Sequence, residues 1–245
     1  MNDRKMGAHC APIGLSERET DWFTAAIQQA ETLAPGPWRV HGKGFATPAP
    51  FRLAKEQGTT AERCAQALAQ TLTLTDTWFS QAIPQGGYVN LTLCPAWYAA
   101  VAAEPARMGG AVTTPVPPLP AFPAEILPAD WRCLCRGSKR PPTPALAARQ
   151  DRGNPAWLVR YTAERLEQLS QRSGINRTSV LEKDQALLLR TAEFPLRSQR
   201  DTPAQLFRYL TGLAQQVWQT ECFTGSAAER CARVLAAGYA QLSQP

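Results

Sequence analysis

Along residues 151–245 the apolar side chains recur every three or four positions, which is the spacing of one face of an α-helix. The pattern predicts helices over 155–172, 179–193, 203–220 and 226–242. The third has Thr202 as N-cap with Gln205 at its third position, and the fourth has Ser226 with Glu229, so both carry capping boxes. Four amphipathic helices can enclose one core, so the pattern predicts an all-α helical bundle.

The first hundred residues have a mixed pattern. Helices are predicted over 15–34, 59–72 (with Thr59 and Glu62 as a capping box) and from Pro95 onwards. Between them, Val89, Leu91 and Leu93 alternate with Tyr88, Asn90 and Thr92, which is typical of a strand with one buried and one exposed face. Two strands, over 74–83 and 87–93 with a turn at 84–87, therefore make this part an α+β domain.

The segment 105–150 holds 10 of the 21 prolines. Because proline fixes φ and lacks a backbone donor, we predict an extended linker, docked locally through Phe122, Ile126 and Trp131. The expected organisation is an α+β domain over 1–104, a proline-rich basic linker over 105–150 and a helical domain over 151–245.

The net charge of the chain and the place of its basic residues indicate which class of partner it could bind. The net charge is +6, and residues 151–245 carry 12 basic residues, of which 11 are arginine. Arginine contacts phosphate through two donors and stacks on bases, so the bias fits an RNA partner. A solvated helical surface would have the same composition, and composition alone leaves both open.

Motifs for catalysis, metals and cofactors are not found in the sequence. His41-Gly42-Lys43-Gly44 lacks the remaining residues of a phosphate-binding loop and is interpreted as a plain turn. Cys133 and Cys135 form the one close cysteine pair, so we expect reduced thiols packed as small hydrophobic groups rather than a metal site. With no apolar run of membrane-spanning length and no apolar core of a signal peptide near the N-terminus, we expect a cytoplasmic chain with no membrane partner.

Residues 42–101 resemble the N-terminal additional domain of arginyl-tRNA synthetases. The resemblance lies in Phe51-Arg-Leu-Ala-Lys55, in the helix Ala61–Leu72 and in the strand Gly87-Tyr-Val-Asn-Leu-Thr-Leu93, which occur in the family's order.

Residues 154–242 resemble the helical anticodon-binding domain of the same enzymes, the DALR domain. Its opening motif is similar to Asn154–Leu166, and its later motifs are similar to Gln185–Pro195, Thr202–Val217 and Arg230–Leu235.

The chain departs from this family where catalysis would take place. A synthetase has a nucleotide-binding catalytic domain between these two parts, with an H-x-G-H motif and a lysine-rich signature loop. Here the interval is the proline-rich segment, neither motif occurs, and Gly137-Ser-Lys-Arg140 is no substitute. The resemblance therefore implies an aminoacyl-tRNA synthetase paralogue that binds tRNA (tRNA-Arg favoured) in translation without ligase activity and without a cofactor.

Three other functions stay open. The chain could be a protein–protein adaptor or specificity subunit for a tRNA-modifying enzyme or a synthetase, or a degenerate paralogue that binds no RNA. A more distant alternative is an accessory role in arginyl-tRNA aminoacylation.

The resemblance also implies contact residues. Tyr88 and Asn90 match the strand that contacts the tRNA D-loop at the elbow, although Tyr88 could equally be a packing residue and Asn90 a strand-edge donor. For the anticodon arm the matching residues are Tyr161 and Arg165, with Arg160, Arg208 and Trp218 as further candidates. Arg165 could instead pair with Glu193 or Glu229, and Trp218 could belong to the core.

Overall fold

The computed structural model describes residues 22–103, 126–138, 142–172, 184–220 and 224–244. The chain divides into two compact units, Met1–Val101 and Ala102–Pro245. Several expectations lie outside the described residues: the helical start at 15–21, the linker over 105–125 with the docking of Phe122, the segment 139–140 and the helical residues 179–183.

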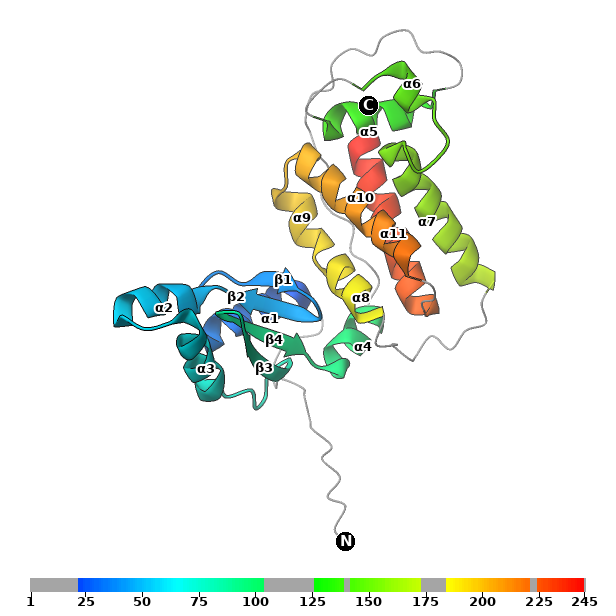
Figure 1. Cartoon of the computed structure of the whole chain (residues 1–245). Coiled ribbons are helices and arrows are strands. Elements are labelled where there is room, and N and C mark those ends of the chain that lie inside the picture. The colour runs from blue at the N-terminus through cyan, green and yellow to red at the C-terminus, as the bar shows by residue number, and fades with distance from the viewer. Residues whose placement is uncertain (1–21, 104–125, 139–141, 173–183, 221–223, 245) are drawn as a thin grey trace. The chain divides into compact units, whose positions relative to one another are not determined.

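A four-stranded antiparallel sheet forms the centre of the first unit (Figure 1). Its strands are β1 (Arg39–His41), β2 (Gly44–Thr47), β3 (Phe79–Gln85) and β4 (Tyr88–Leu93), in the order β1-β2-β4-β3. The β3–β4 hairpin was predicted, but β3 begins at Phe79 rather than at 74, and Pro84 and Gln85 belong to it rather than to the turn. Gly86 and Gly87 in the turn both have positive φ, at 55° and 79°. The β1–β2 hairpin was not predicted, because strands of three and four residues are too short to show an alternating pattern. Gly42 and Lys43 connect these two strands.

The two faces of the sheet differ as the alternation in β4 predicts. Phe45 pairs with Leu91 and Thr47 with Val89, and all four side chains are buried. Helix α1 (Trp22–Leu33) packs on this face, where the ring of Phe23 lies 5.6 Å from that of Phe45. Helix α4 (Pro95–Ala103) adds two fully buried aromatic rings, Trp97 and Tyr98.

Helices α2 (Ala49–Gln57) and α3 (Ala61–Thr71) lie at the β3–β4 turn. The N-cap of α3 is Thr60 rather than the predicted Thr59, since the Thr60 hydroxyl accepts the Arg63 amide at 3.3 Å. Thr60 has the extended backbone that an N-cap requires, with φ −93° and ψ 151°.

The second unit is a helical bundle. Its long helices are α7 (Pro155–Arg172), α10 (Pro203–Gln219) and α11 (Gly225–Ser243), and the capping box of Thr202 and Gln205 is confirmed. The N-cap of α11 is Thr224 rather than the predicted Ser226. The predicted helix over 179–193 is described as α8 (Gln185–Ala192), which ends before Pro195. Pro195 lies in the first turn of the next helix, α9 (Phe194–Arg200).

The prediction of a linker was wrong for residues 126–138 and 142–150. This part of the chain contains α5 (Pro128–Gly137) and the short α6 (Pro144–Ala147). The prolines lie in the first turns of these helices, where a missing amide hydrogen costs nothing. Because Trp131, Cys133 and Leu134 of α5 are buried in the helical core, α5 belongs to the bundle; the expected docking through Ile126 and Trp131 is confirmed by their burial.

A buried carboxylate ties α5 to the bundle. Asp130 is 3% exposed and accepts hydrogen bonds from Arg160 of α7, at 3.3 Å, and from the hydroxyl of Tyr239 of α11. Burial, and then the bond to Asp130, raise the pKa of Tyr239, so its hydroxyl stays protonated as a donor at neutral pH.

Replacing Asp130 with alanine should therefore lower the free energy of unfolding by about 3 kcal/mol, because Arg160 and Tyr239 lose their shared acceptor. Urea denaturation followed by circular dichroism measures this. The control, Glu229→Ala, removes the partner of Arg233 on the surface of α11 and should cost about 0.5 kcal/mol. Equal stability losses in both variants would show that Asp130 does not join these helices.

Candidate nucleic-acid interface

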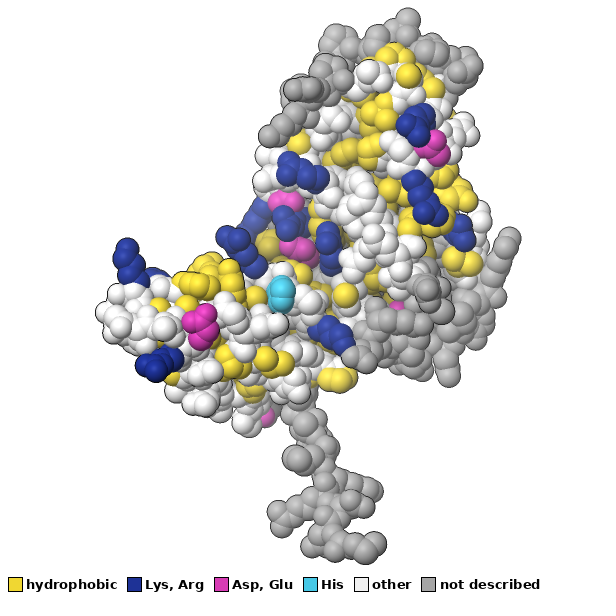
Figure 2. Space-filling view, viewed as in Figure 1, with side chains coloured by type: hydrophobic (Ala, Val, Ile, Leu, Met, Phe, Trp, Pro, Cys, Tyr) yellow, Lys and Arg dark blue, Asp and Glu magenta, His cyan; other side chains and the backbone are white. Residues whose placement is uncertain are grey.

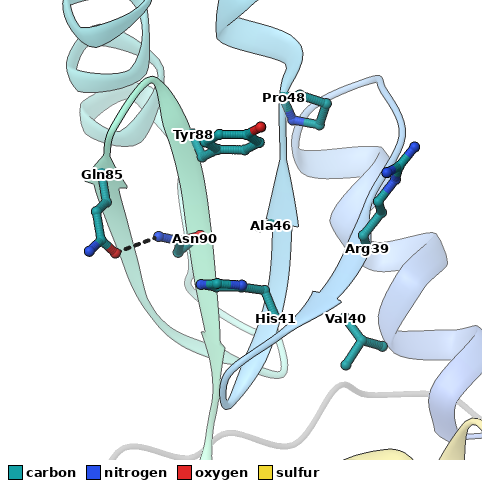
Figure 3. Close-up of a pocket in the computed structure, with 8 residues that line it drawn as sticks. All are labelled: Arg39, Val40, His41, Ala46, Pro48, Gln85, Tyr88 and Asn90. Carbon is teal, nitrogen blue, oxygen red and sulfur yellow. Dashed lines mark hydrogen bonds between the residues drawn. The ribbon is translucent and has the colours of Figure 1, made fainter.

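The second face of the sheet forms a shallow pocket of about 560 Å³. Arg39 and Ala46 pair across β1 and β2, and Ala46 pairs with Asn90 of β4, so these three residues share the face. Figure 3 shows Tyr88 and Asn90 projecting into the pocket from β4, with His41 pointing towards Asn90. The lining residues are Arg39, Val40, His41, Ala46, Pro48, Gln85, Tyr88 and Asn90.

Tyr88 and Asn90 lie together as their alternation predicts. Tyr88 is 43% exposed, and the Nδ2 of Asn90 donates to the Oε1 of Gln85 at 3.2 Å. Asn90 is not a strand-edge donor, because β4 lies between β2 and β3. Its side-chain oxygen has no hydrogen-bond partner among the described residues, so it can accept a hydrogen bond from a ligand.

The ring of Tyr88 is held from one side by Phe51 of α2. The two rings meet edge to face with their centroids 5.1 Å apart. This contact depends on Gly87, since a Cβ there would lie 2.7 Å from the Phe51 ring and 2.9 Å from the Cβ of Ala61. His41, Arg39 and Gln85 were not predicted as site residues, because only the sheet register brings them near Tyr88. Phe51 was not predicted either, because it reaches Tyr88 only through the packing of α2.

Two substitutions in one turn test this arrangement. Gly86→Ala places a Cβ in open space and should cost about 1 kcal/mol for its positive φ. Gly87→Ala carries the same conformational cost and also displaces Phe51, so it should destabilise the protein by about 2 kcal/mol more. Thermal denaturation measures both. Equal losses would show that the Phe51–Tyr88 contact does not depend on Gly87.

A second candidate surface in the helical unit is built from three parallel rings. Trp157 and Tyr161, one turn apart on α7, stack at 4.5 Å with an interplanar angle of 10°. Tyr161 is parallel to Trp218 of α10 at 6.2 Å and 12°. The indole Nε1 of Trp218 donates to the hydroxyl of Thr162 at 2.8 Å, which fixes the ring at its polar edge. We call Trp157, Tyr161 and Trp218 the aromatic ladder.

Two arginines lie over the last ring of the aromatic ladder. The guanidinium carbon of Arg152 is 4.1 Å from the Trp218 centroid, and that of Arg165 is 4.8 Å from it. The alternative that Arg165 pairs with Glu193 or Glu229 is wrong, because Arg165 forms no ion pair with a described residue, whereas these carboxylates pair with Arg197 and Arg233. The alternative that Trp218 belongs to the core is correct in part, because its ring is partly buried and packs against the core.

The remaining candidates lie elsewhere. Arg160 is bound by Asp130 and Glu164, which makes it a structural residue. Arg208 is exposed on α10, ten residues before Trp218, or about 15 Å along the helix axis. Trp157 and Arg152 were not among the predicted residues. The spacing of Trp157, Tyr161 and Arg165 at intervals of four is the local signal that could have identified Trp157.

Pairing separates the arginines of the helical unit into two groups. Arg149, Arg160, Arg197 and Arg233 form ion pairs with carboxylates. Within the described part of the chain, Arg152, Arg165, Arg200 and Arg208 form none. Figure 2 shows basic side chains on the visible face of this unit, some of them beside acidic ones. The two arginines on Trp218 therefore combine unneutralised charge with an aromatic surface.

The described residues contain no candidate metal site, since no three of their His, Cys, Asp or Glu side chains are grouped so that they could hold a metal ion. None of the described helices has the length and apolar character needed to cross a membrane. The described cysteines are free thiols, and burial raises the pKa of Cys231 to about 12, which keeps that thiol protonated at neutral pH.

Comparison of the chain with models of protein families, with curated proteins and with solved structures found no match in any of the three.

Proposed function

We propose that this chain is a non-catalytic tRNA-binding protein related to arginyl-tRNA synthetase, with tRNA-Arg as the favoured ligand. The observation that carries the proposal is the aromatic ladder of the helical unit with two arginines over its last ring. Unpaired RNA bases stack on aromatic rings and guanidinium groups, while arginine donors bind phosphate. The ladder supplies both kinds of contact at one place.

The helical unit is proposed to bind the anticodon arm through Tyr161, Arg165 and Trp218. Tyr161 and Trp218 offer parallel rings, which suit bases splayed out of a loop better than bases stacked within a duplex. Arg165 lies beside them without a carboxylate partner among the described residues. Arg160 is not included, because Asp130 and Glu164 already neutralise it.

The sheet unit is proposed to bind the tRNA elbow. Its pocket combines an exposed ring at Tyr88 with a hydrogen-bond acceptor at Asn90 and a cation at Arg39. An unpaired base could stack on the ring and bond to the amide, and Arg39 could bind the adjoining phosphate. Two such contacts on one chain would bind more tightly than either alone, provided that both can reach one tRNA.

Purified protein should shift tRNA-Arg in a gel at about 50 mM salt, and the affinity should fall steeply as salt rises. Arg165→Ala should weaken binding about tenfold, because it removes a phosphate donor at the ladder. The control, Arg233→Ala, makes the same change in net charge but removes an arginine that is already paired with Glu229, so it should change affinity less than threefold.

Three results would count against this proposal in different ways. No shift at low salt would overturn RNA binding and leave the protein–protein adaptor. Equal binding of all tRNAs would remove the preference for tRNA-Arg. Equal effects of Arg165→Ala and Arg233→Ala would reduce the ladder's role to overall charge.

The elbow contact has its own test. The double variant Tyr88→Ala/Asn90→Ala should bind complete tRNA about tenfold more weakly, because a stacked base and its hydrogen bond are lost. It should bind the isolated anticodon stem-loop as tightly as the wild type, since that RNA has no elbow. Gln81→Ala, in the exposed part of β3, is the control for surface changes on the same sheet. An unchanged affinity for complete tRNA would overturn this site and leave the helical site in place.

A further inference from the structure

Arg152 lies on the aromatic ladder although it belongs to no helix. It is exposed and stands in the turn before α7, yet its guanidinium carbon is 4.1 Å from the Trp218 centroid. No carboxylate among the described residues pairs with it. The guanidinium carbon therefore lies over an indole ring, while the side chain as a whole is exposed to solvent.

The turn around Arg152 is held firmly on both sides. Before it, Asp151 accepts the amide of Gly153 at 2.7 Å and pairs with Arg149 at 3.1 Å. These two interactions, the amide first, lower the pKa of Asp151, so the carboxylate stays charged at neutral pH.

After it, Asn154 is fully buried and caps α7, accepting the amides of Ala156 and Trp157 at 3.0 and 3.2 Å. The Asn154 amide group also donates to the backbone oxygens of Ala147 and Arg149, at 3.1 and 3.0 Å. The backbone that carries Arg152 is thus fixed before any ligand binds.

We propose that the Arg152 guanidinium is the outermost plate of the aromatic ladder, and that an unpaired RNA base stacks on its solvent side. This inference rests on the proposed function and adds a specific contact to it. A guanidinium is planar and weakly hydrated, so it can stack on an indole ring and on a base at the same time. Because the turn is already ordered, little conformational entropy is lost when the base arrives.

By this proposal, lysine cannot replace the arginine at this position. An ammonium group is a compact, strongly hydrated point charge, which can attract phosphate but offers no plane for stacking. Charge and stacking can therefore be separated by a single substitution. Arg152→Lys keeps the charge and removes the plate, whereas Arg152→Ala removes both.

The test uses the full chain and the isolated anticodon stem-loop of tRNA-Arg. Arg152→Lys should weaken binding about tenfold, close to the loss in Arg152→Ala, because the stacked plate is lost in both. The slope of log affinity against log salt should stay unchanged in the lysine variant and fall by about one in the alanine variant. Arg233→Ala again controls for net charge, and unchanged melting temperatures show that the variants are folded.

Abasic substitutions then identify the stacked base. Each loop nucleotide of the stem-loop is replaced in turn by an abasic site, and binding of the wild type is compared with that of Arg152→Lys. At one position the two proteins should bind equally well, since neither has a base to stack there.

The outcomes separate this inference from the function on which it rests. If the wild type does not bind the stem-loop, the proposed anticodon-arm contact fails and this inference fails with it. If the wild type binds and Arg152→Lys binds equally well, Arg152 acts as a charge alone and only this inference is overturned. Tighter binding by Arg152→Ala would also overturn it, because the arginine would then be competing with the base for Trp218. The inference would also be overturned if Arg152→Lys weakened binding by the same factor at every abasic position as it does with the intact stem-loop.

Discussion

At both candidate sites, a contact within the protein holds an aromatic ring along one edge or on one side. The position of the rest of the ring's surface depends on that contact. Trp218 is fixed through its indole nitrogen to the Thr162 hydroxyl, which is itself bonded to the Leu158 carbonyl at 2.6 Å. Tyr88 is supported by Phe51, and Phe51 fits there because Gly87 has no Cβ. Burying part of a large aromatic ring stabilises the fold. At both sites the buried part of the ring leaves the rest of the ring accessible. The positions of Arg152 and Arg165 over Trp218 follow from this arrangement.

The ion pairs show which arginines of the helical unit keep an unneutralised charge. Arg160 and Arg197 each contact two carboxylates, so their charges are neutralised within the protein. The arginines over Trp218 are not neutralised by the described residues, and their cation–π contacts leave their hydrogen-bond donors available. The number of arginines therefore overstates how many could bind an RNA. The arginines that could do so are those that do not pair with a carboxylate.

Proline-rich sequence was the main source of error in the expected organisation. A proline removes one amide hydrogen, and that loss matters inside a helix but not in its first turn. Pro128 and Pro144 lie in the first turns of α5 and α6, so a segment that suggested a linker contributes both helices to the bundle. Trp131 and Leu134 supply the apolar area that makes this packing favourable.

The sequence by itself determined the features that depend on neighbouring residues. The helical period located α7 and α10, the capping box of Thr202 and Gln205 set where α10 begins, and the alternation in β4 placed Tyr88 and Asn90 on one polar face. Only the tertiary structure decided which distant residues meet: Trp218 with Thr162, Asp130 with Arg160 and Tyr239, and β1 with β2. These contacts depend on how helices and strands pack, and packing joins residues whose spacing along the chain carries no period. Tyr161, Arg165 and Trp218 were candidates through a resemblance of sequence motifs, whereas the place of Arg152 on the Trp218 ring depends on packing alone.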